Sequence, residues 1–424
     1  MPFAVSADRF RFLSRQLLNH LWVRPAAVGL LSMIAAFTAR WADRTRLATM
    51  VPKMSADSIE SLLSLMAASM LVIATFAVAS MVAAYSSASS TATPRSFTLI
   101  VSDDVSQNAL STFIGAFIYS IIALTAMRNN YYGDAATFII FVLTALVFIA
   151  VVLTFVRWVD RIARLGRLGA TIDKVEDAAA EAFRRRLAAP TLNGVPIRDG
   201  EPNGVPVFTD QVGYVQHIDV EALQQWAKRT GLQVAVAALQ GSFVTPDRVL
   251  ARIIGSEDGR CDTAGLVGAF LIGGDRVFDD DPRFGLVALA EIAGRALSPG
   301  INDPGTAIDV IGTAVRLFVL WNEGGAVDAS SSPRFDLVHV PELAVRDMFD
   351  DAFAAIARDG AGSVEVAVRL QKALRALACL DAPAMRAAAI YHSRLALARS
   401  EKAMDMNEDL LAVREAARFS ANAA

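Results

Sequence analysis

The sequence predicts an α-helical membrane protein with four transmembrane helices, followed by a cytosolic α+β region made of a small β-rich module and a C-terminal helical bundle. Composition is the first reason, because 54% of the 424 residues are hydrophobic and 20% are charged, against about 45–50% and about 25% in soluble domains. Charge distribution is the second, because residues 1–170 carry 14 Lys and Arg against 8 Asp and Glu, whereas the remainder carries 26 against 35. We therefore expect a basic, apolar membrane half and an acidic, soluble half, with two or three domains in total.

Four apolar runs in the first half are each about as long as the helix of roughly 20 residues that crosses a bilayer. A tryptophan and an arginine flank the first run on each side, as is typical of the two membrane interfaces. A cleaved signal peptide is the alternative for this run, but the run is long and starts late, which favours a retained helix. The expected spans of a transmembrane domain over residues 1–156 are 23–39, 62–84, 110–127 and 135–156.

Basic residues near the ends of these runs predict the orientation. Four arginines lie before or at the start of the first run, four follow the fourth, and Arg95 lies in the second loop, so nine basic residues are expected inside and five outside. Because Lys and Arg accumulate on the cytoplasmic side, we expect both termini in the cytoplasm and a multi-pass protein of the bacterial inner membrane. Pro94 and Arg95 are candidate functional residues of the cytosolic loop between the second and third spans.

None of the four runs has an ionisable residue near its middle, which argues against pumps and proton-coupled transporters. The second and third runs instead carry small and hydroxylated side chains. Close helix packing is the favoured explanation, since small side chains four residues apart let helix backbones approach in lipid. A polar strip that lines a passive pore is the alternative. Its candidate lining residues are Ser69, Thr75, Ser80, Ser111, Tyr119 and Ser120.

Residues 157–189 keep a helical periodicity beyond the fourth span and predict an amphipathic linker helix. Prolines and glycines then separate short β-like runs in residues 190–280, which predict a small β-rich module, with a compact barrel as one arrangement. Within it, Asp219 is expected to cap a helix that Gly231 ends. Residues 281–424 predict an α-helical cytosolic domain. Its expected helices are 283–297, 306–321, 341–358, 363–379, 382–398 and 402–420.

Three segments stand out as motifs. Residues 295–307 read RALSPGINDPGTA and follow Phe284-Gly285-Leu286, and shorter segments begin at Pro94-Arg95 and at Gly213-Tyr214. Together they resemble the signature "RALSPGINDP.TA" and its accompanying motifs in a bacterial family of predicted membrane proteins of unknown function. The resemblance covers most of the chain and implies four N-terminal spans and a cytosolic domain, but no reaction. Relatives tend to have a paired histidine where this chain has Arg157-Trp158, so no role of those histidines transfers here.

The segment 298–304 is a candidate functional loop between two expected helices. Asn302 or Asp303 can cap the second helix, and Pro304 suits its first turn because proline lacks an N–H that has no partner there. A rigid capped turn or a contact between protomers is favoured. The alternative is a ligand or ion site, because the N–H groups at a helix start attract anions, and catalysis is the least favoured. The candidate residues are Ser298, Pro299, Gly300, Asn302, Asp303 and Pro304.

The other chemistry-bearing residues predict no catalytic residue, no cofactor and no metal site. The acidic stretch Asp279–Asp281 lacks the spacing of a calcium loop, so a solvated, helix-capping turn is the favoured interpretation. The four histidines stand apart in the sequence and only two cysteines are present, so neither a zinc motif nor a disulfide scaffold is expected. No nucleophile elbow, phosphate-binding loop or dinucleotide motif occurs. The excess basic charge lies beside apolar runs, which disfavours a nucleic-acid binder.

Two functions from different classes fit these observations. The first is a passive ion channel or translocation pore, in which four-span protomers form a homo-oligomer and the acidic cytosolic half is a vestibule that concentrates cations. The second is a membrane-anchored sensor or scaffold whose cytosolic domain binds a small ligand or a partner protein. Oligomeric geometry discriminates between them, because a closed ring around a continuous polar path favours the channel. The partners expected are lipid, further copies of the chain, and ions or a small molecule, without nucleic acid.

Overall fold

The computed structural model describes residues 23–44, 51–52, 54–91, 93–101, 104–162, 168–197, 200, 203–255, 263–324 and 333–421. The described residues divide into two compact units, one within residues 10–171 and the other within residues 172–424. Each unit has its own core, and each is described by itself.

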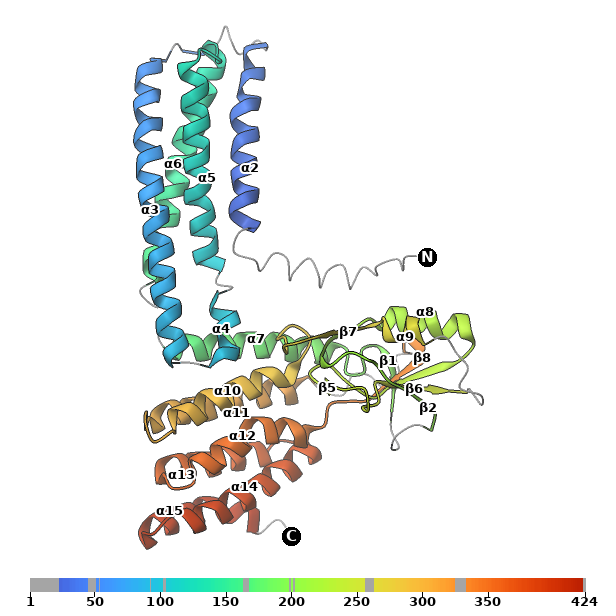
Figure 1. Cartoon of the computed structure of the whole chain (residues 1–424). Helices are drawn as coiled ribbons and strands as arrows, with labels where there is room; N and C mark the ends of the chain where they lie inside the picture. The colour runs from blue at the N-terminus through green and yellow to red at the C-terminus, as the bar shows by residue number, and fades with distance from the viewer. Residues whose placement is uncertain are drawn as a thin grey trace. The chain divides into compact units, whose positions relative to one another are not determined.

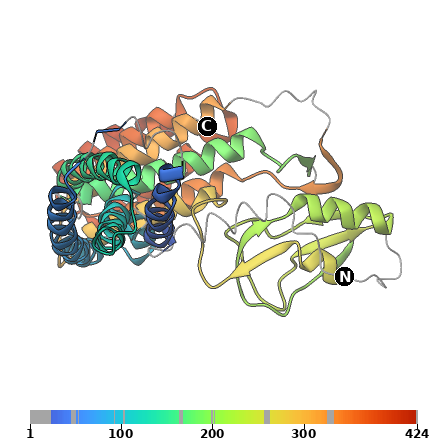
Figure 2. The same ribbon diagram turned by 90° about the horizontal axis from the view of Figure 1, so that it is seen from above.

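Four long helices form the unit within residues 10–171, and Figure 2 shows them nearly end-on as a bundle. Helix α5 contacts the other three, so it is the central helix of the bundle. A short helix, η1, follows α2, and another, α4, joins α3 to α5. The bounds are α2 Val23–Thr38, η1 Ala39–Arg44, α3 Ala56–Thr91, α4 Pro94–Val101, α5 Asp104–Arg128 and α6 Asp134–Ile162. The four expected spans coincide with α2 and its η1 extension and with parts of α3, α5 and α6.

Glycines set the close approach of α2 and α5. A Cβ atom at Gly115 would lie 2.4 Å from Val28 Cγ1, and one at Gly29 would lie 2.7 Å from Ile118 Cδ1. Both separations are too short for real carbon atoms, so a larger residue at either position would require a neighbour to shift. At Gly115 that neighbour is the stiff side chain of Val28. The close-packing interpretation of the small residues therefore holds for this pair of helices.

By length and composition, five helices among the described residues are apolar enough to cross a membrane. Four of them are the helices expected from the sequence, and the fifth is α11 in the other unit. The observed candidates therefore exceed the predicted four spans by one. They are Val23–Arg44, Ala56–Ser86, Val105–Arg128, Asp134–Ile162 and Pro304–Glu323.

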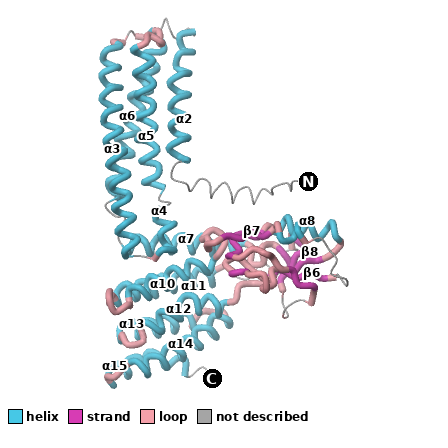
Figure 3. Tube along the Cα trace, viewed as in Figure 1, coloured by secondary structure: helices cyan, strands magenta, loops and turns pink. Residues whose placement is uncertain are grey.

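The unit within residues 172–424 contains two sheets, drawn in magenta in Figure 3. The larger has the strand order β1-β8-β4-β6-β2, and the smaller has the order β5-β3-β7. Two sheets thus occupy the region where a compact barrel was one expectation. The strands are β1 Gly194–Pro196, β2 Val205–Val207, β3 Gly213–Ile218, β4 Gln233–Val236, β5 Phe243–Val244, β6 Ala251–Ile254, β7 Phe270–Gly273 and β8 Phe335–Val340.

Strand β8 corrects the predicted separation of a β-rich module from a helical domain. It lies in the chain between two helices, yet it pairs in parallel with both β1 and β4, with Val338 opposite Val234 and His339 opposite Val195. Val338 and Val234 are fully buried in the shared core. The physical reason is that the sheet lacks a central strand until residues 335–340 return to it, so residues 190–280 do not complete the sheet alone.

The helices of this unit match the sequence prediction closely. Asp219 caps α8 by accepting a hydrogen bond from the Ala222 N–H at 2.9 Å, and Gly231 ends the helix with a φ of 73°. The six expected C-terminal helices appear as α10 to α15, which lie side by side in Figure 1. The bounds are α8 Val220–Thr230, α9 Ala264–Val267, α10 Pro282–Ala296, α11 Pro304–Glu323, α12 Val345–Asp359, α13 Val364–Ala378, α14 Pro383–Ala403 and α15 Asn407–Ala421.

Helix α7, Leu168–Ala188, occupies most of the region predicted as a linker helix. From Ile172 onward it belongs to the unit within residues 172–424 and packs on two of its helices. Ala179 lies against Gly285 of α10, and the Phe183 ring meets Trp321 of α11 edge-on at 5.2 Å. Because its apolar face is covered by α10 and α11, α7 is an integral part of this unit, and its C-terminal end is held at the sheets.

Candidate functional site

The predicted functional loop is a capped corner between α10 and α11. Asp303 accepts hydrogen bonds from the Thr306 N–H at 3.1 Å and from the Thr306 hydroxyl at 2.6 Å, and Pro304 is the first residue of α11. These bonds lower the pKa of the Asp303 carboxyl. The Ser298 hydroxyl donates to the Arg295 carbonyl at 2.7 Å, and Asn302 has a left-handed φ of 49°. Pro299, Gly300 and Asn302 are exposed, so the described geometry is that of a solvent-facing turn.

The six predicted pore-lining residues do not form one strip. Ser111, Tyr119 and Ser120 are buried in the interior of the bundle, Ser69 and Ser80 are half-buried, and Thr75 is exposed. The Tyr119 hydroxyl lies 2.9 Å from the Thr144 hydroxyl and donates to the Ile140 carbonyl, which joins α5 to α6. The Thr75 hydroxyl donates to the Leu71 carbonyl of its own helix. The three candidate residues on α5, Ser111, Tyr119 and Ser120, therefore lie inside the four-helix bundle of one chain.

Pro94 and Arg95 lie in the short helix α4 and not in a loop. Pro94 is its first residue, where the missing N–H of proline costs no intrahelical hydrogen bond. Thr93 precedes it and exchanges hydrogen bonds with Ser96, whose hydroxyl donates to the Thr93 carbonyl at 2.9 Å. The expected loop is thus replaced by a capped helical turn.

The acidic stretch before α10 is a capping turn, as the sequence predicted, but the expectation of a solvated turn is wrong for Asp281, which is buried against Arg276 and Gly241. Asp281 accepts a hydrogen bond from the Arg283 N–H at 3.1 Å and caps α10. Its other oxygen accepts from Arg276 Nε at 2.7 Å, and a Cβ at Gly241 would collide with it at 2.2 Å. Asp281 is 2% exposed, so the turn places one carboxylate inside and leaves Asp279 and Asp280 beside a cavity.

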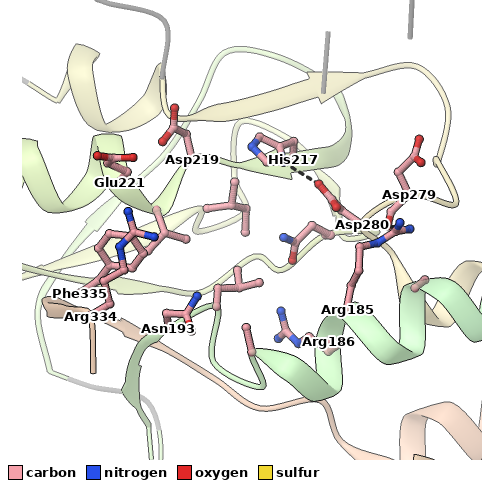
Figure 4. A pocket seen from close by; sticks show the side chains of 16 residues that line it. Arg185, Arg186, Asn193, His217, Asp219, Glu221, Asp279, Asp280, Arg334 and Phe335 are labelled. Atoms are coloured by element: carbon pink, nitrogen blue, oxygen red, sulfur yellow. Dashed lines mark hydrogen bonds and ion pairs between the residues drawn. The ribbon is translucent and has the colours of Figure 1, made fainter. Parts of the chain in front are cut away.

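A cavity of about 190 Å³ lies within residues 182–335, and Figure 4 shows the side chains around it. Its walls come from the C-terminal end of α7, the turn at residues 192–193, the end of β3 with the start of α8, Gln240, the Asp279–Asp280 turn, and the start of β8. The volume is much larger than the share of one water molecule, which is about 30 Å³. The cavity therefore has room for a small molecule.

Two consecutive arginines at the end of α7 form one wall. Arg185 donates hydrogen bonds to Glu181 and to the Asp279 carbonyl, which fix its side chain. Arg186 is only 4% exposed, and one of its terminal nitrogens donates to the Pro341 carbonyl at 3.3 Å. Its Nε is buried and has no hydrogen-bond partner among the described residues. Burial lowers the pKa of the Arg186 guanidinium to about 10, so the group stays charged at neutral pH.

His217 and Asp280 form a pair on the opposite wall. His217 Nδ1 donates to Asp280 Oδ2 at 2.6 Å, and Figure 4 shows this contact as a dashed line. The pairing of β3 with β7 shifts its register between Val215 and His217. Such an irregularity changes the direction of neighbouring side chains. One oxygen of the Asp280 carboxylate is thus occupied by the imidazole beside it.

The remaining wall combines acidic and aromatic residues. Asp219 is 4% exposed and is engaged in capping α8, while Glu221 lies in the first turn of the same helix. The Arg334 guanidinium stacks over the Phe335 ring at 5.0 Å from its centroid. Both residues line the cavity. Acidic, basic and aromatic groups therefore surround one small volume, which suits the binding of a small polar molecule.

The turn that follows α7 and lines the cavity has a left-handed backbone at two consecutive residues. Leu192 and Asn193 both have left-handed φ angles, of 52° and 62°, and a leucine rarely adopts this conformation. The Phe335 N–H donates to the Asn193 carbonyl at 3.0 Å, which ties this turn to β8. The wall is therefore held in place by the same strand that completes the sheet.

Sequence reasoning did not identify Arg185, Arg186 or Arg334 as site residues, and it left His217 without a role. One signal was present: Ala179, Phe183 and Arg186 recur at spacings of four and three, so Arg186 falls on the apolar face of its helix. An arginine on a buried face needs partners or a ligand. Among the described residues, no group of three or more His, Cys, Asp or Glu side chains is arranged to hold a metal ion.

Comparison with known proteins gives a family without an assigned activity. The profile of a family described as predicted membrane protein (DUF2254) matches residues 19–376. An uncharacterized protein of Mycobacterium tuberculosis (strain CDC 1551 / Oshkosh) and one of Mycobacterium bovis (strain ATCC BAA-935 / AF2122/97) are each 32% identical over 118 residues, which is 26% of this chain. The alignment spans 22% of the length of these relatives. No solved structure matches. Because the family profile covers most of the chain, the chain belongs to this DUF2254 family of predicted membrane proteins of unknown function.

Proposed function

We propose that the chain is a membrane-anchored binding protein of the bacterial inner membrane. Helices α2, α3, α5 and α6 span the bilayer, and the unit within residues 172–424 lies in the cytoplasm and holds a small polar ligand. The observation that carries the proposal is the cavity at the end of α7, which is lined by charged side chains and includes the buried Arg186. Concave sites with a few convergent polar groups are where small ligands bind.

Four spans are proposed in preference to five because of how α11 packs. In α11 the Phe318 ring is fully buried, and its centroid lies 4.4 Å from that of the Phe349 ring of α12. In the bundle, by contrast, large apolar side chains such as Leu31, Val72 and Leu153 are 66%, 68% and 55% exposed. Exposed apolar surface of this kind is favourable against lipid and costly in water. The excess of arginines beside the first and fourth spans supports cytoplasmic termini.

The binding function is favoured over the passive channel for a structural reason. Tyr119 of α5 is engaged with α6, and Ser111 donates to the Gln107 carbonyl of its own helix at 2.6 Å. A pore lined by these hydroxyls would require the protomer to open its own bundle. The homo-oligomer expected from the sequence stays a prediction, which native mass spectrometry in mild detergent tests.

The experiment compares two tryptophan variants of the full chain in lipid nanodiscs. Ala189 is half-buried and lines the cavity, whereas the neighbouring Ala188 is exposed and does not line it. A panel of small polar metabolites should raise the melting temperature of the wild type, since a ligand at 100 times its Kd stabilises by about 2.7 kcal/mol. Ala189→Trp should abolish this rise and Ala188→Trp should retain it. Ion flux through liposomes without any ligand effect would favour the channel instead.

A further inference from the structure

We propose that the ligand enters this cavity with an oxyanion group, a carboxylate or a phosphoryl group, that binds the guanidinium of Arg186. This inference rests on the proposed function, because it names the chemistry of the ligand that the cavity holds. Three features support it: the burial and incomplete hydrogen bonding of Arg186, the pairing of the other charged groups, and the carboxylates that line the cavity.

Arg186 is the most deeply buried of the three arginines that line the cavity. Its side chain is 4% exposed, and its Nε has no partner among the described residues. Its hydrogen bond to the Pro341 carbonyl is long, at 3.3 Å. A guanidinium has five N–H donors in a planar fork that matches the two oxygens of a carboxylate or phosphoryl group. A buried cation that lacks such an acceptor is costly. An oxyanion in the cavity would supply the missing acceptors.

The carboxylates whose charge acts on Arg186 are those of Glu342 and Asp280, and among the described residues neither forms a hydrogen bond or ion pair with it. Asp280 instead accepts the hydrogen bond from His217 at 2.6 Å. Arg185, its neighbour in α7, is held by Glu181 and the Asp279 carbonyl. In Figure 4 the Arg186 guanidinium lies between the side chains of Asn193 and Arg185. Arg186 is thus the cation of this wall that is available to a ligand.

The acidic residues around the cavity limit the charge of the ligand. Four carboxylates line it, those of Asp219, Glu221, Asp279 and Asp280, and they repel an anion of high charge. We therefore infer a small ligand with one acidic group, such as a carboxylic acid or a phosphate monoester, in preference to a polyphosphate.

The test measures melting temperature and binding on the full chain in nanodiscs, with sodium acetate and inorganic phosphate as probes and sodium chloride at equal ionic strength as baseline. Arg186→Gln should lose the anion-dependent rise in melting temperature and weaken binding more than 100-fold. Arg186→Lys should weaken it about tenfold, because the charge stays and the fork is lost. Arg184→Gln is the control, since Arg184 is an exposed neighbour on the same helix and does not line the cavity.

The same variants separate a binding role from a structural one. Without anion, Arg186→Gln should melt at the same temperature as the wild type or higher, because it removes a buried charge that forms no ion pair among the described residues. A lower melting temperature of Arg186→Gln without anion, with an unchanged response to acetate and phosphate, would overturn the inference. Arg186 would then stabilise the fold through its hydrogen bond to the Pro341 carbonyl. A carboxylate response without a phosphate response, or the reverse, identifies which oxyanion the site takes.

Failure of this inference differs from failure of the proposed function. If neutral or cationic metabolites bind and Ala189→Trp blocks them while the anions have no effect, the cavity binds a ligand of another charge and the anion inference is wrong. If no metabolite of any charge binds, the proposed function fails as well. Nanodiscs of phosphatidylcholine and of phosphatidylglycerol distinguish a free oxyanion from a lipid headgroup, because only the latter stabilises the wild type without added probe.

Discussion

Two histidines of the unit within residues 172–424 lie outside the cavity, and His392 is buried while His339 is half-buried. His339 Nε2 lies 3.0 Å from Gln233 Oε1, and His392 Nε2 lies 3.3 Å from Asp350 Oδ1. Burial lowers the pKa of both imidazoles, because the charged form loses its hydration. A base with a lowered folded pKa contributes stability above its unfolded pKa of about 6.5, and this stability is lost as the pH falls below that value.

Acidification should therefore lower the stability of the protein, and His392→Gln should reduce this dependence. His392 is 2% exposed, and the charged groups that face it are Asp350, Arg346 and Arg399. Its protonation would add a cation beside two arginines, and only the Asp350 carboxylate opposes this. The melting temperature of the wild type should fall from about pH 7.5 to about pH 5.5 more steeply than that of His392→Gln. Parallel curves for the two proteins would show that His392 does not titrate in this range.

Asp303 should behave as a helix cap and not as a charged site residue. Asp303→Asn keeps the capping oxygen, so the free energy of unfolding should change by no more than about 0.5 kcal/mol at neutral pH, whereas Asp303→Ala should lose about 1 kcal/mol. Because hydrogen bonds lower the pKa of Asp303, its charged form contributes stability above about pH 4 that is lost as the pH falls through the folded pKa. Chemical denaturation from neutral to acid pH measures both. A loss of several kcal/mol in Asp303→Asn would instead indicate a buried charge partner.

Residue-level prediction succeeded where the physics is local. The Asp219 cap, the Gly231 end and the start of α11 at Pro304 follow from short-range rules for helix termini, and each is confirmed. Arg186 could not be identified in the same way, because its burial depends on α10, α11 and β8 packing around α7. The pairing of His217 with Asp280 likewise joins residues 63 positions apart, a separation that no local pattern encodes.

At the scale of elements, α2 and α5 depend on glycine for their close packing. Gly115→Leu would drive its side chain into Val28, where even a Cβ would lie at 2.4 Å. Overpacking of this kind costs typically about 1–3 kcal/mol. We expect a lower melting temperature of the full chain in detergent and greater protease sensitivity of the α2 segment.

The control for this prediction is Gly169→Ala. Gly169 is an exposed position in α7, and a Cβ there would meet nothing within 4 Å. Since alanine is a better helix former than glycine by about 1 kcal/mol, this variant should be neutral or stabilising. Equal melting temperatures for Gly115→Leu and the wild type would contradict tight packing of α2 on α5.

Helices were predicted far better than strand topology, for a physical reason. The periodicities of α10 to α15 are local, and each helix lies within a few residues of its expected range. Strand β8 was missed, although Pro333 and Pro341 bracket a short run rich in β-forming residues, Phe335–Val340. Its partners are more than 90 residues away in the chain, and long-range pairing leaves no periodic signal.

At the scale of the whole molecule, one half consists of apolar helices and the other of a sheet and helix unit with a polar cavity. This division was predictable from composition, since the apolar runs and the basic residues both lie in the first 170 positions. The cavity was not, because it is formed by α7, β3, the turn before α10, and β8 together. Membership of a family of predicted membrane proteins agrees with the apolar half.

The proposed topology predicts a pattern of cysteine labelling. In a variant that lacks Cys261 and Cys379, Asn129→Cys between α5 and α6 should react with an impermeant thiol reagent on intact spheroplasts. Ser298→Cys should react only after permeabilisation, because the turn between α10 and α11 is proposed to be cytoplasmic. Labelling of Ser298→Cys on intact cells, with Asn129→Cys protected, would reverse the orientation.

Hydrogen–deuterium exchange of the full chain in nanodiscs shows whether the cavity at the end of α7 binds a small polar ligand. The exchange is compared with and without the low-molecular-weight fraction of a bacterial extract, in the wild type and in Ala189→Trp. If the cavity binds a ligand, the extract should slow exchange in the wild type at the cavity walls, residues 182–193, 217–221 and 334–335. The extract should not slow exchange in Ala189→Trp, nor in α2, α3, α5 and α6 of either protein. Protection confined to the spanning helices, or the same protection in both proteins, would contradict binding in this cavity.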